Sequence, residues 1–326
     1  MTYRPLNRRQ FGQIAGATLL GATLPLPLFA QAAGKRIEYI TFGLQYEFQV
    51  SLVDGIVKRA KEAGIDINVL DGKGDPNLQI TQVLDAITKQ PDVLLVNPID
   101  ASLLVGGLRK ANEAGIPVFI LENPPEGIDY LGFVDFDNEA GGRMGADALA
   151  DLIGPDGAVL EALGSTGSAQ AIARHKGFSE QAKAKYPGWK IKELNTEWSS
   201  DTTFKMVLDA FTENPDIKGM FSASDEMLRG AVPALRQIGR LVAPGEPGHV
   251  ALVGLDGAPA ALKRIREGTQ QATVGQSTWA MGGGGIMEQI VAYLDGKSYD
   301  EKMRTQPLLI TKDNAGDPEL WGNQMG

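Results

Sequence analysis

The chain contains no cysteine, which excludes disulfides, thiolate metal sites and a cysteine nucleophile. Histidine is almost as scarce. The two copies, His175 and His249, lie far apart in the sequence, and no acid stands beside them at the spacing of a metal motif. We therefore predict no metal site and no cofactor. Because the sequence offers neither a nucleophile–base pair nor a metal set, we also predict that the protein is not an enzyme.

Basic residues are also few. The 326 residues include 31 Lys and Arg against 40 Asp and Glu. The first 33 residues hold three arginines and no acid, so residues 34–326 carry 28 basic and 40 acidic side chains, a formal charge of about −12. Nucleic-acid-binding proteins normally show a basic patch or stripe. We expect no nucleic-acid partner.

Phosphate-binding motifs are missing as well. Residues 164–169, GSTGSA, look like a phosphate loop but lack the Lys-Ser/Thr pair of a P-loop and the spacing of GxGxxG. Glycines 282–285 fall at a predicted helix start, where small residues allow close packing. Neither segment therefore indicates a nucleotide.

The first 33 residues have the pattern of an export signal. A pair of arginines at 8–9 precedes Phe11, an apolar run follows at 14–29, and residues 30–32 form an A-x-A cleavage pattern. The arginine pair resembles a twin-arginine signal, with an ordinary Sec signal as the alternative. A membrane anchor is disfavoured because the run is short and contains two prolines. We expect cleavage near Ala32 and a mature protein in the periplasm.

Beyond the signal, strands and helices alternate along the whole chain. Nearly continuous apolar strands, such as VLLVN at 93–97, indicate a parallel sheet that is covered on both faces. The strand–helix pattern starts again at 157–164, GAVLEALG, so we predict an α/β protein of two similar lobes with a cleft between them. A break near Asp135–Asp137 is one candidate crossover. Residues 304–313 form a final extended segment that could return to the second lobe.

The stretch that opens the first half combines a strand, a loop and a helix. Residues 36–42 alternate in polarity and predict a strand, and the helical spacing from Val50 predicts a helix that ends at Gly64. We predict that the intervening residues 43–49, GLQYEFQ, form a loop. Ligands of such sheets lie outside the carboxyl ends of the strands. We therefore expect this loop to line a site with aromatic faces.

Five segments, in order, resemble the type I periplasmic sugar-binding proteins, the ribose-binding group. They are VSLVDGI, PDVLLVNPIDAS, ANEAGIPVFIL, FSASDEMLRGAVPAL and VALVGLDGAP. The resemblance runs from about Arg36 to Asp313. It implies two doubly wound parallel-sheet lobes, joined by a three-crossover hinge, that close on a sugar and deliver it to an ABC importer. We place the N-terminal lobe at 34–135 plus 277–306 and the C-terminal lobe at 136–276 plus 307–326.

The resemblance implies several ligand contacts in the second half. Arg174 matches the family arginine that reaches into the cleft, where its fork can hold two oxygens or an aspartate. Asp256, at a predicted strand end, matches the aspartate that accepts hydrogen bonds from sugar hydroxyls. Gln276 matches a ligand amide beside the second crossover.

Two further positions of the second half correspond to ligand contacts of the family. Trp198 matches an aromatic residue that stacks on the sugar. Ser224 stands where the family usually has an asparagine that touches the ligand, and we expect the following Asp225 to cap a helix.

The first half departs more from the family. Its residues at ligand positions are Phe42, Tyr46, Phe48, Glu122 and Asn123. Phe42 and Tyr46 stand where smaller polar residues are common, Gln49 replaces a second aromatic residue, and the Glu-Asn pair replaces Asp-Arg. More aromatic bulk and less positive charge suggest a small, neutral ligand, either a monosaccharide or a sugar alcohol.

The leading hypothesis is therefore a solute receptor for an ABC importer, with the permease and its ATPase as partners. We expect a monomer. The alternative is a ligand-sensing partner of a membrane chemoreceptor or sensor kinase, which would have the same fold and site. An exported enzyme on this fold would need catalytic groups that the sequence does not offer. A sugar-responsive transcription factor is disfavoured because the export segment occupies the place of its DNA-binding helices.

Overall fold

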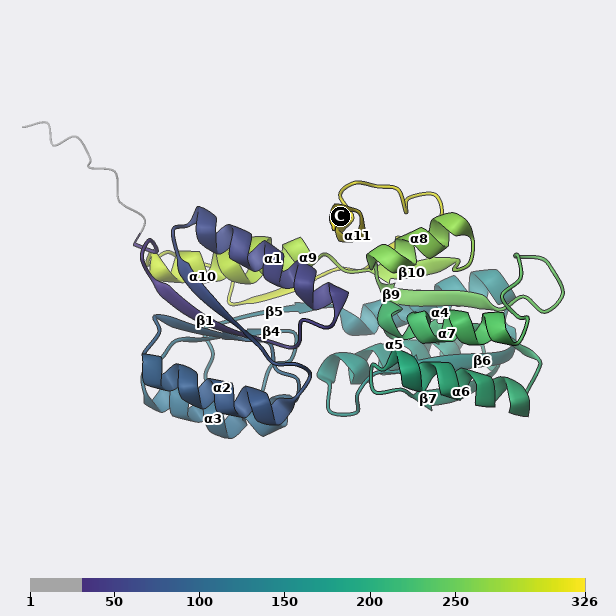
Figure 1. The fold of residues 1–326 in the computed structure, drawn as a ribbon, viewed down its shortest axis with the longest axis horizontal. Helices are drawn as coiled ribbons and strands as arrows, with labels where there is room; N and C mark the ends of the chain where they lie inside the picture. The colour runs from purple at the N-terminus through teal and green to yellow at the C-terminus, as the bar shows by residue number, and fades with distance from the viewer. Residues whose placement is uncertain (1–30, 326) are drawn as a thin grey trace, which may run out of the picture.

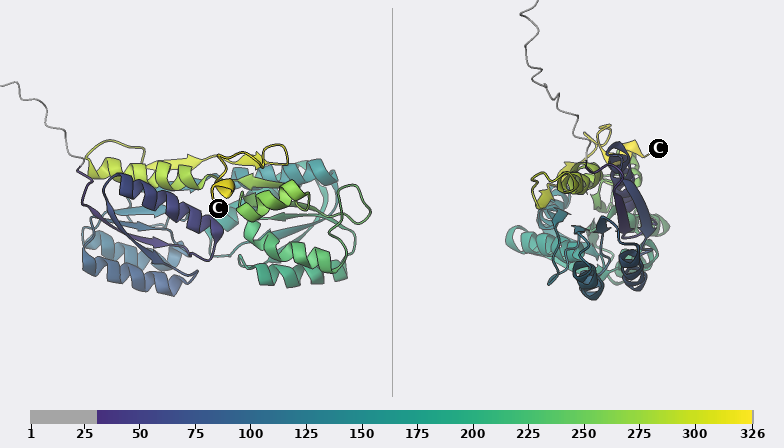
Figure 2. Two further views of the ribbon diagram at one scale, coloured as in Figure 1. Left: turned by 45° about the horizontal axis from the view of Figure 1, so that its top comes forward. Right: turned by 90° about the vertical axis from the view of Figure 1, so that its left-hand side faces the viewer.

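The computed structural model describes residues 31–325. The predicted export signal therefore lies outside the described residues, except for its last three positions. Two six-stranded sheets, each with helices on both faces, form two lobes that lie side by side along the long axis of the molecule (Figures 1 and 2). Within the described part of the chain, every helix is too short or too polar to cross a bilayer.

The first lobe is built on a fully parallel sheet with the strand order β11-β5-β4-β3-β1-β2. Helix α1 and the segment from α9 to α10 cover one face, and α2 and α3 cover the other (Figure 1). The strands are β1 (Arg36–Thr41), β2 (Asp66–Asp71), β3 (Val93–Val96), β4 (Val118–Leu121), β5 (Gly132–Phe136) and β11 (Lys302–Thr305). The helices are α1 (Glu47–Glu62), α2 (Pro76–Lys89), α3 (Ala101–Glu113), α9 (Thr278–Met281), the π-helical turn η2 (Gly282–Ile286) and α10 (Met287–Leu294).

The second lobe repeats this plan with the strand order β12-β10-β9-β8-β6-β7. Helices α4 and α5 pack against each other, as do α6 and α7. The strands are β6 (Asp156–Leu163), β7 (Gly188–Asn195), β8 (Ile217–Ser222), β9 (Ala251–Asp256), β10 (Ala272–Gly275) and β12 (Leu308–Ile310). The helices are α4 (Asn138–Ile153), α5 (Ala169–Lys185), α6 (Ser200–Glu213), α7 (Asp225–Gln237), α8 (Pro259–Glu267) and α11 (Trp321–Gln324).

The alternation of apolar residues along the strands explains the layers. Ile37 and Tyr39 of β1 belong to the core beneath α1, whereas Ile40 belongs to the core beneath α2 and α3. Successive side chains of a strand point to opposite faces, so a strand between two helical layers must be apolar on both. The predicted α/β fold of two lobes is confirmed, with one strand that departs from the parallel pattern: β12 runs antiparallel to β10.

The chain passes between the two sheets three times. The passages lie between β5 and α4, between β10 and α9, and between β11 and β12. The first is the break that the sequence predicted near Asp135–Asp137. The last extended segment, expected to return to the second lobe, is divided: β11 pairs with β5 of the first sheet, and only β12 joins the second.

Three local predictions need correction. Helix α1 begins at Glu47, three residues before the predicted start, so Phe48 lies in its first turn and the loop is shorter. Helix α11, near the C-terminus, was not predicted. The glycines at 282–285 form a π-helical turn inside a longer helical segment and not a helix start.

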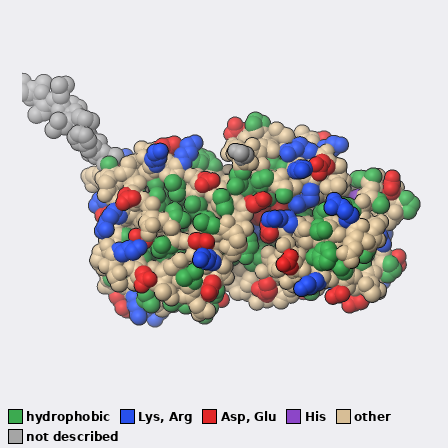
Figure 3. Space-filling model, in the orientation of Figure 1, with side chains coloured by type: hydrophobic (Ala, Val, Ile, Leu, Met, Phe, Trp, Pro, Cys, Tyr) green, Lys and Arg blue, Asp and Glu red, His purple; other side chains and the backbone are tan. Residues whose placement is uncertain are grey.

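These glycines do allow the close packing that the sequence suggested. A Cβ atom at Gly282 would lie 2.9 Å from the Leu52 carbonyl oxygen of α1, and one at Gly283 would lie 2.8 Å from that of Gly55. Charged side chains of both signs are interspersed over the face shown in Figure 3, so this face carries no extended basic patch.

Two glycines set the contact between α4 and α5 and make it sensitive to mutation. A Cβ at Gly142 would lie 2.1 Å from the backbone oxygen of Arg174, and a Cβ at Gly177 would lie 2.1 Å from that of Glu139. We predict that Gly142→Ala and Gly177→Ala each lower the free energy of unfolding by about 1–3 kcal/mol, because the helices must separate. Chemical denaturation measures the change.

Gly106 provides the matched control. It lies on the exposed face of α3, and no atom lies within 4 Å of a Cβ added there. Gly106→Ala should stabilise the protein by about 0.5–1 kcal/mol, since alanine is the better helix former. Equal effects at Gly106 and at the α4–α5 glycines would contradict this account of the contact.

Candidate functional site

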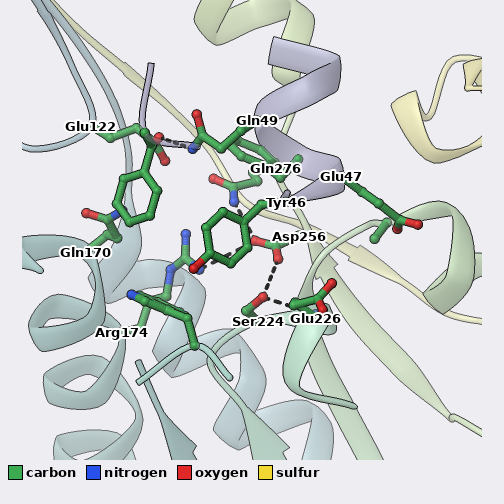
Figure 4. A pocket seen from close by; sticks show the side chains of 14 residues that line it. Tyr46, Glu47, Gln49, Glu122, Gln170, Arg174, Ser224, Glu226, Asp256 and Gln276 are labelled. Carbon is green, nitrogen blue, oxygen red and sulfur yellow. Dashed lines mark hydrogen bonds and ion pairs between the residues drawn. The ribbon is translucent and has the colours of Figure 1, made fainter. Parts of the chain in front are cut away.

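A pocket lies between the lobes, at the carboxyl ends of the strands of both sheets (Figure 4). Its volume is about 570 Å³, part of which is open to solvent. Nine of the ten predicted ligand-binding residues line it, and Asn123 does not. The lining residues are Phe42, Tyr46, Glu47, Phe48, Gln49, Glu122, Gln170, Arg174, Trp198, Ser224, Glu226, Asp256, Ala258 and Gln276.

Asp256, the last residue of β9, is the central acceptor of the second-lobe wall. Its Oδ1 accepts from Gln276 Nε2 at 2.7 Å and lies 3.5 Å from Arg174 Nη1. Its Oδ2 accepts from Ser224 Oγ at 2.9 Å and from the Asp225 amide at 3.3 Å. The side chain is buried. A buried carboxylate needs such donors, because leaving it unpaired costs several kcal/mol.

Arg174, on α5, is held from three sides. Its Nε donates to Asn138 Oδ1 at 2.8 Å, and its Nη1 donates to the backbone oxygen of Ala223 at 2.7 Å as well as facing Asp256. The guanidinium also lies 5.8 Å from the ring centroid of Trp198. These contacts fix the plane of a group that is 3% exposed. The arginine therefore presents a preorganised polar edge to the pocket.

The first-lobe wall contains a network of amides and one carboxylate. Glu122 Oε2 accepts from Gln49 Nε2 at 2.8 Å and from Asn97 Nδ2 at 2.6 Å. Asn97 Nδ2 also lies 2.9 Å from Gln49 Oε1. Within residues 31–325, Glu122 Oε1 makes no hydrogen bond. Gln49 belongs to the loop that the sequence predicts to line the site, whereas Asn97 was not predicted.

Aromatic side chains line both walls. Phe42 and Tyr46 meet edge to face with their ring centroids 5.6 Å apart, and Phe48 meets Trp321 of α11 in the same way at 5.8 Å. Trp198 packs over Gly164, where an added Cβ would lie 2.2 Å from the indole ring. Rings at these positions offer apolar faces beside the polar groups described above.

Three pocket residues hold a backbone conformation that L-amino acids rarely adopt. The φ angles of Glu122, Trp198 and Asp256 are 60°, 62° and 130°. Such conformations cost roughly 1–3 kcal/mol each and persist where the surroundings fix them, often at binding sites. Glu122 directly follows β4, Asp256 ends β9, and Trp198 lies in the connection between β7 and α6, so these three strained residues all lie in the pocket wall.

Several buried polar atoms of the pocket have no hydrogen-bond partner within the described chain. They are Gln170 Oε1, Gln276 Oε1 and Trp198 Nε1. Leaving such an atom unsatisfied costs roughly 1–3 kcal/mol. The pocket thus contains acceptors and a donor that a bound polar molecule would complete.

Two predicted roles differ in the structure. Asn123 is buried behind the pocket wall, where its Nδ2 donates to Pro98 O at 2.7 Å and its Oδ1 accepts from the Ala169 amide at 3.1 Å. Asp225 does not cap α7. Ser224 takes that position, with its Oγ accepting from the Glu226 amide, while Asp225 accepts from the amides of residues 257 and 258.

Glu47 and Gln49 belong to the 43–49 loop that the sequence predicts to line a site, although neither was named as a ligand contact. Sequence reasoning missed three further lining residues, which are Gln170, Glu226 and Ala258. Each lies one to three residues from a position that the sequence did single out, or in the first turn of a helix that begins at the cleft. The beginning of the helix that follows each strand could therefore have indicated these residues.

The buried state of Asp256 predicts a dependence of stability on pH. Burial raises the pKa of its carboxyl to about 7, against the opposing effect of Arg174. Between about pH 4 and pH 7 the folded protein then holds a proton that the unfolded chain has released. The native state binds more protons, so the free energy of unfolding falls as pH rises, by up to about 1.4 kcal/mol per unit from this group.

Urea unfolding at a series of pH values from 4.5 to 7.5 measures this slope. Asp256→Asn should reduce it, and Asp209→Asn, at an exposed position of α6, should not. The same slope in wild-type protein and Asp256→Asn would show that Asp256 does not titrate in this range.

Comparison with known proteins places this architecture in a family. A family model described as a periplasmic binding protein domain matches residues 37–298. The ribose import binding protein of Salmonella typhimurium is 28% identical over 94% of this chain and 100% of its own length. The D-apiose import binding protein of Actinobacillus succinogenes is 27% identical over 92% of this chain and 95% of its own.

Solved structures of ABC transporter solute binding proteins have the same fold as this chain. An ABC transporter periplasmic solute binding protein from Actinobacillus succinogenes with bound D-allose is 26% identical and superposes with a TM-score of 0.78, covering 86% of this chain and 99% of that one. An ABC transporter solute binding protein from Mycobacterium smegmatis with bound glycerol is 29% identical, also with a TM-score of 0.78, covering 86% and 95%. The matched region spans most of both lobes, and the chain therefore belongs to the periplasmic binding protein family.

Proposed function

We propose that the pocket binds one small, uncharged carbohydrate, a monosaccharide or a sugar alcohol, and that the protein delivers it to an ABC permease and its ATPase. The observation that carries this proposal is the pairing of unsatisfied buried polar atoms, on Gln170, Gln276 and Trp198, with aromatic rings in one pocket between two lobes. A sugar combines hydroxyl groups with apolar C–H faces, so it complements both features.

Hydroxyl groups suit these polar atoms because each hydroxyl both donates and accepts. Gln170 Oε1 and Gln276 Oε1 would accept hydroxyl hydrogens, as would the free oxygen of Glu122. Trp198 Nε1 would donate to a hydroxyl oxygen. An analogue that lacks one of these hydroxyls would leave a buried protein atom unpaired at a cost of roughly 1–3 kcal/mol, which provides the selectivity.

The charges favour a neutral ligand. Within residues 31–325, Arg174 is the only cation that lines the pocket, and it already faces Asp256. Glu122 and Glu226 add negative charge. An anionic ligand would therefore meet net repulsion and a cation that is already paired. The relatives that carry ribose, D-apiose and D-allose in their names support a neutral sugar for this chain.

We further propose that the two lobes close on the ligand about the three passages. The lobes would consist of 34–135 plus 277–306 and 136–276 plus 307–326. Contacts between them include the Asn123–Ala169 hydrogen bond and the Phe48–Trp321 ring pair, which both fit the closed arrangement. Ligand that touches both walls would favour this arrangement over an open one.

Delivery requires that the protein be exported. The predicted signal in the first 33 residues, with cleavage near Ala32, supports a location in the periplasm. There the closed protein would present a surface made by both lobes to the permease.

A screen of sugars and polyols by thermal shift tests the ligand class. At least one neutral carbohydrate should raise the melting temperature of the wild-type protein by mass action. Arg174→Ala and Asp256→Ala should weaken its binding about 100-fold or more, because each removes a polar group that lines the pocket and leaves its buried partner unpaired. Arg236→Ala, an exposed arginine of α7, is the control and should bind as the wild type does. If no member of a broad panel shifts the melting temperature, the carbohydrate proposal fails.

The absence of cysteine makes closure directly measurable. Cysteines introduced at Asp85 on α2 and at Lys205 on α6, both exposed, would carry a donor and an acceptor dye on opposite lobes (Figure 1). Ligand should increase energy transfer between the two dyes as the lobes approach each other. In a protein that also carries Arg174→Ala, the same increase should require a far higher ligand concentration. A ligand that stabilises the protein but leaves transfer unchanged would contradict hinge closure.

A further inference from the structure

A second cluster of ionisable side chains lies outside the cleft, at the edge of the second sheet. Strands β6 and β7 pair in a register that sets Glu161 directly opposite Glu193. His175 of α5 lies over this pair: its Nδ1 is 3.0 Å from Glu161 Oε1, and its Nε2 is 4.0 Å from Glu193 Oε1. One imidazole nitrogen and one oxygen from each carboxylate all lie within 4.8 Å of one another.

The arrangement has an electrostatic and hydrogen-bonding demand that a single imidazole meets only in part. Like charges directly opposite each other on adjacent strands destabilise a sheet. Glu161 is fully buried, and its Oε2 has no hydrogen-bond partner in the part of the chain that the structure describes. The imidazole ring of His175 contacts Oε1 of this carboxylate and does not contact Oε2. His175 can offset one of the two carboxylates, and Glu161 Oε2 still has no partner within residues 31–325.

A divalent transition-metal ion would meet this demand. One imidazole nitrogen with two carboxylate oxygens is a donor set that zinc and related ions accept, with water in the remaining position. The 3.0 Å between His175 and Glu161 already suits two ligands of one ion. Glu193 has a side chain that is 57% exposed and free to swing the remaining distance, so an ion can enter from solvent.

We propose that Glu161, His175 and Glu193 form a binding site for a divalent transition-metal ion such as zinc. The ion would fasten α5 to the two strands beneath it. His175 follows Arg174 in the sequence, but it belongs to a different surface, beside the small hollow that includes Leu163 and Ala171. The metal site and the ligand pocket are thus separate.

No metal site was predicted from the sequence, because no acid stands near either histidine at motif spacing. Residues 161, 175 and 193 are separated by 14 and 18 positions, and only the register of β6 with β7 brings the carboxylates together. No local sequence motif indicates such a site.

Zinc titration by calorimetry tests the proposal, on chain purified without a histidine tag and stripped with a chelator. We expect one zinc per wild-type chain. His175→Ala and Glu193→Gln should each weaken binding at least about tenfold, since loss of an outer-shell partner alone costs a metal site about 10–100-fold. Both side chains are partly exposed, so the variants should fold. His249→Ala, which removes the other histidine, is the matched control and should bind zinc as the wild type does.

Nitrogen-15 NMR of the two histidine rings gives an independent reading. Zinc should shift the ring signals of His175 and leave those of His249 in place. The proposal is overturned if the wild type binds no zinc, if His175→Ala binds it as tightly, or if Ca²⁺ or Mg²⁺ binds more tightly than zinc. In those cases the cluster is a histidine ion pair or a general acidic surface.

Discussion

The buried carboxylate of Asp256 is the interaction on which the cleft depends. It ends β9 in a strained backbone conformation, and its oxygens take hydrogen bonds from Ser224 and Gln276 while facing Arg174. These partners come from α5, from the start of α7 and from a passage between the lobes. Removing one partner of a buried pair costs about 3–5 kcal/mol, so the carboxylate holds segments that are far apart in the sequence in one geometry.

The same residue connects the second lobe to the first through its backbone. Trp321 donates from Nε1 to the Asp256 carbonyl at 2.9 Å, and its ring meets Phe48 of α1. A short helix near the C-terminus therefore bridges an aromatic wall of the first lobe and the acidic centre of the second. Both walls therefore contact one side chain, that of Trp321.

The fold could be predicted from the alternation of strands and helices, and most residues of the candidate pocket were expected from the resemblance to a family, with a physical reason for where they lie. Parallel strands place their carboxyl ends at one edge, so polar residues directly after apolar strands converge. Glu122 and Gln276 directly follow β4 and β10, Asp256 ends β9, and Ser224 lies two residues after β8.

What the sequence did not predict depends on tertiary contacts. Asn123 follows the same strand as Glu122 but turns away to bind the Ala169 amide of the other lobe. Helix α1 starts early, and α11 has no periodic pattern long enough to detect at four residues. The opposition of Glu161 and Glu193 follows from strand register, which local pattern does not specify across a crossover helix.

Helix α5 shows how one element serves two surfaces without coupling them closely. Consecutive residues of an α-helix point about 100° apart, so Arg174 faces the pocket while His175 faces the sheet edge. The helix itself is fixed by the close contact of Gly142 and Gly177 with its neighbour α4. An ion at the sheet edge would therefore add stability to an element whose position is already set, and the pocket geometry would stay as the glycine contact and the Asp256 network define it.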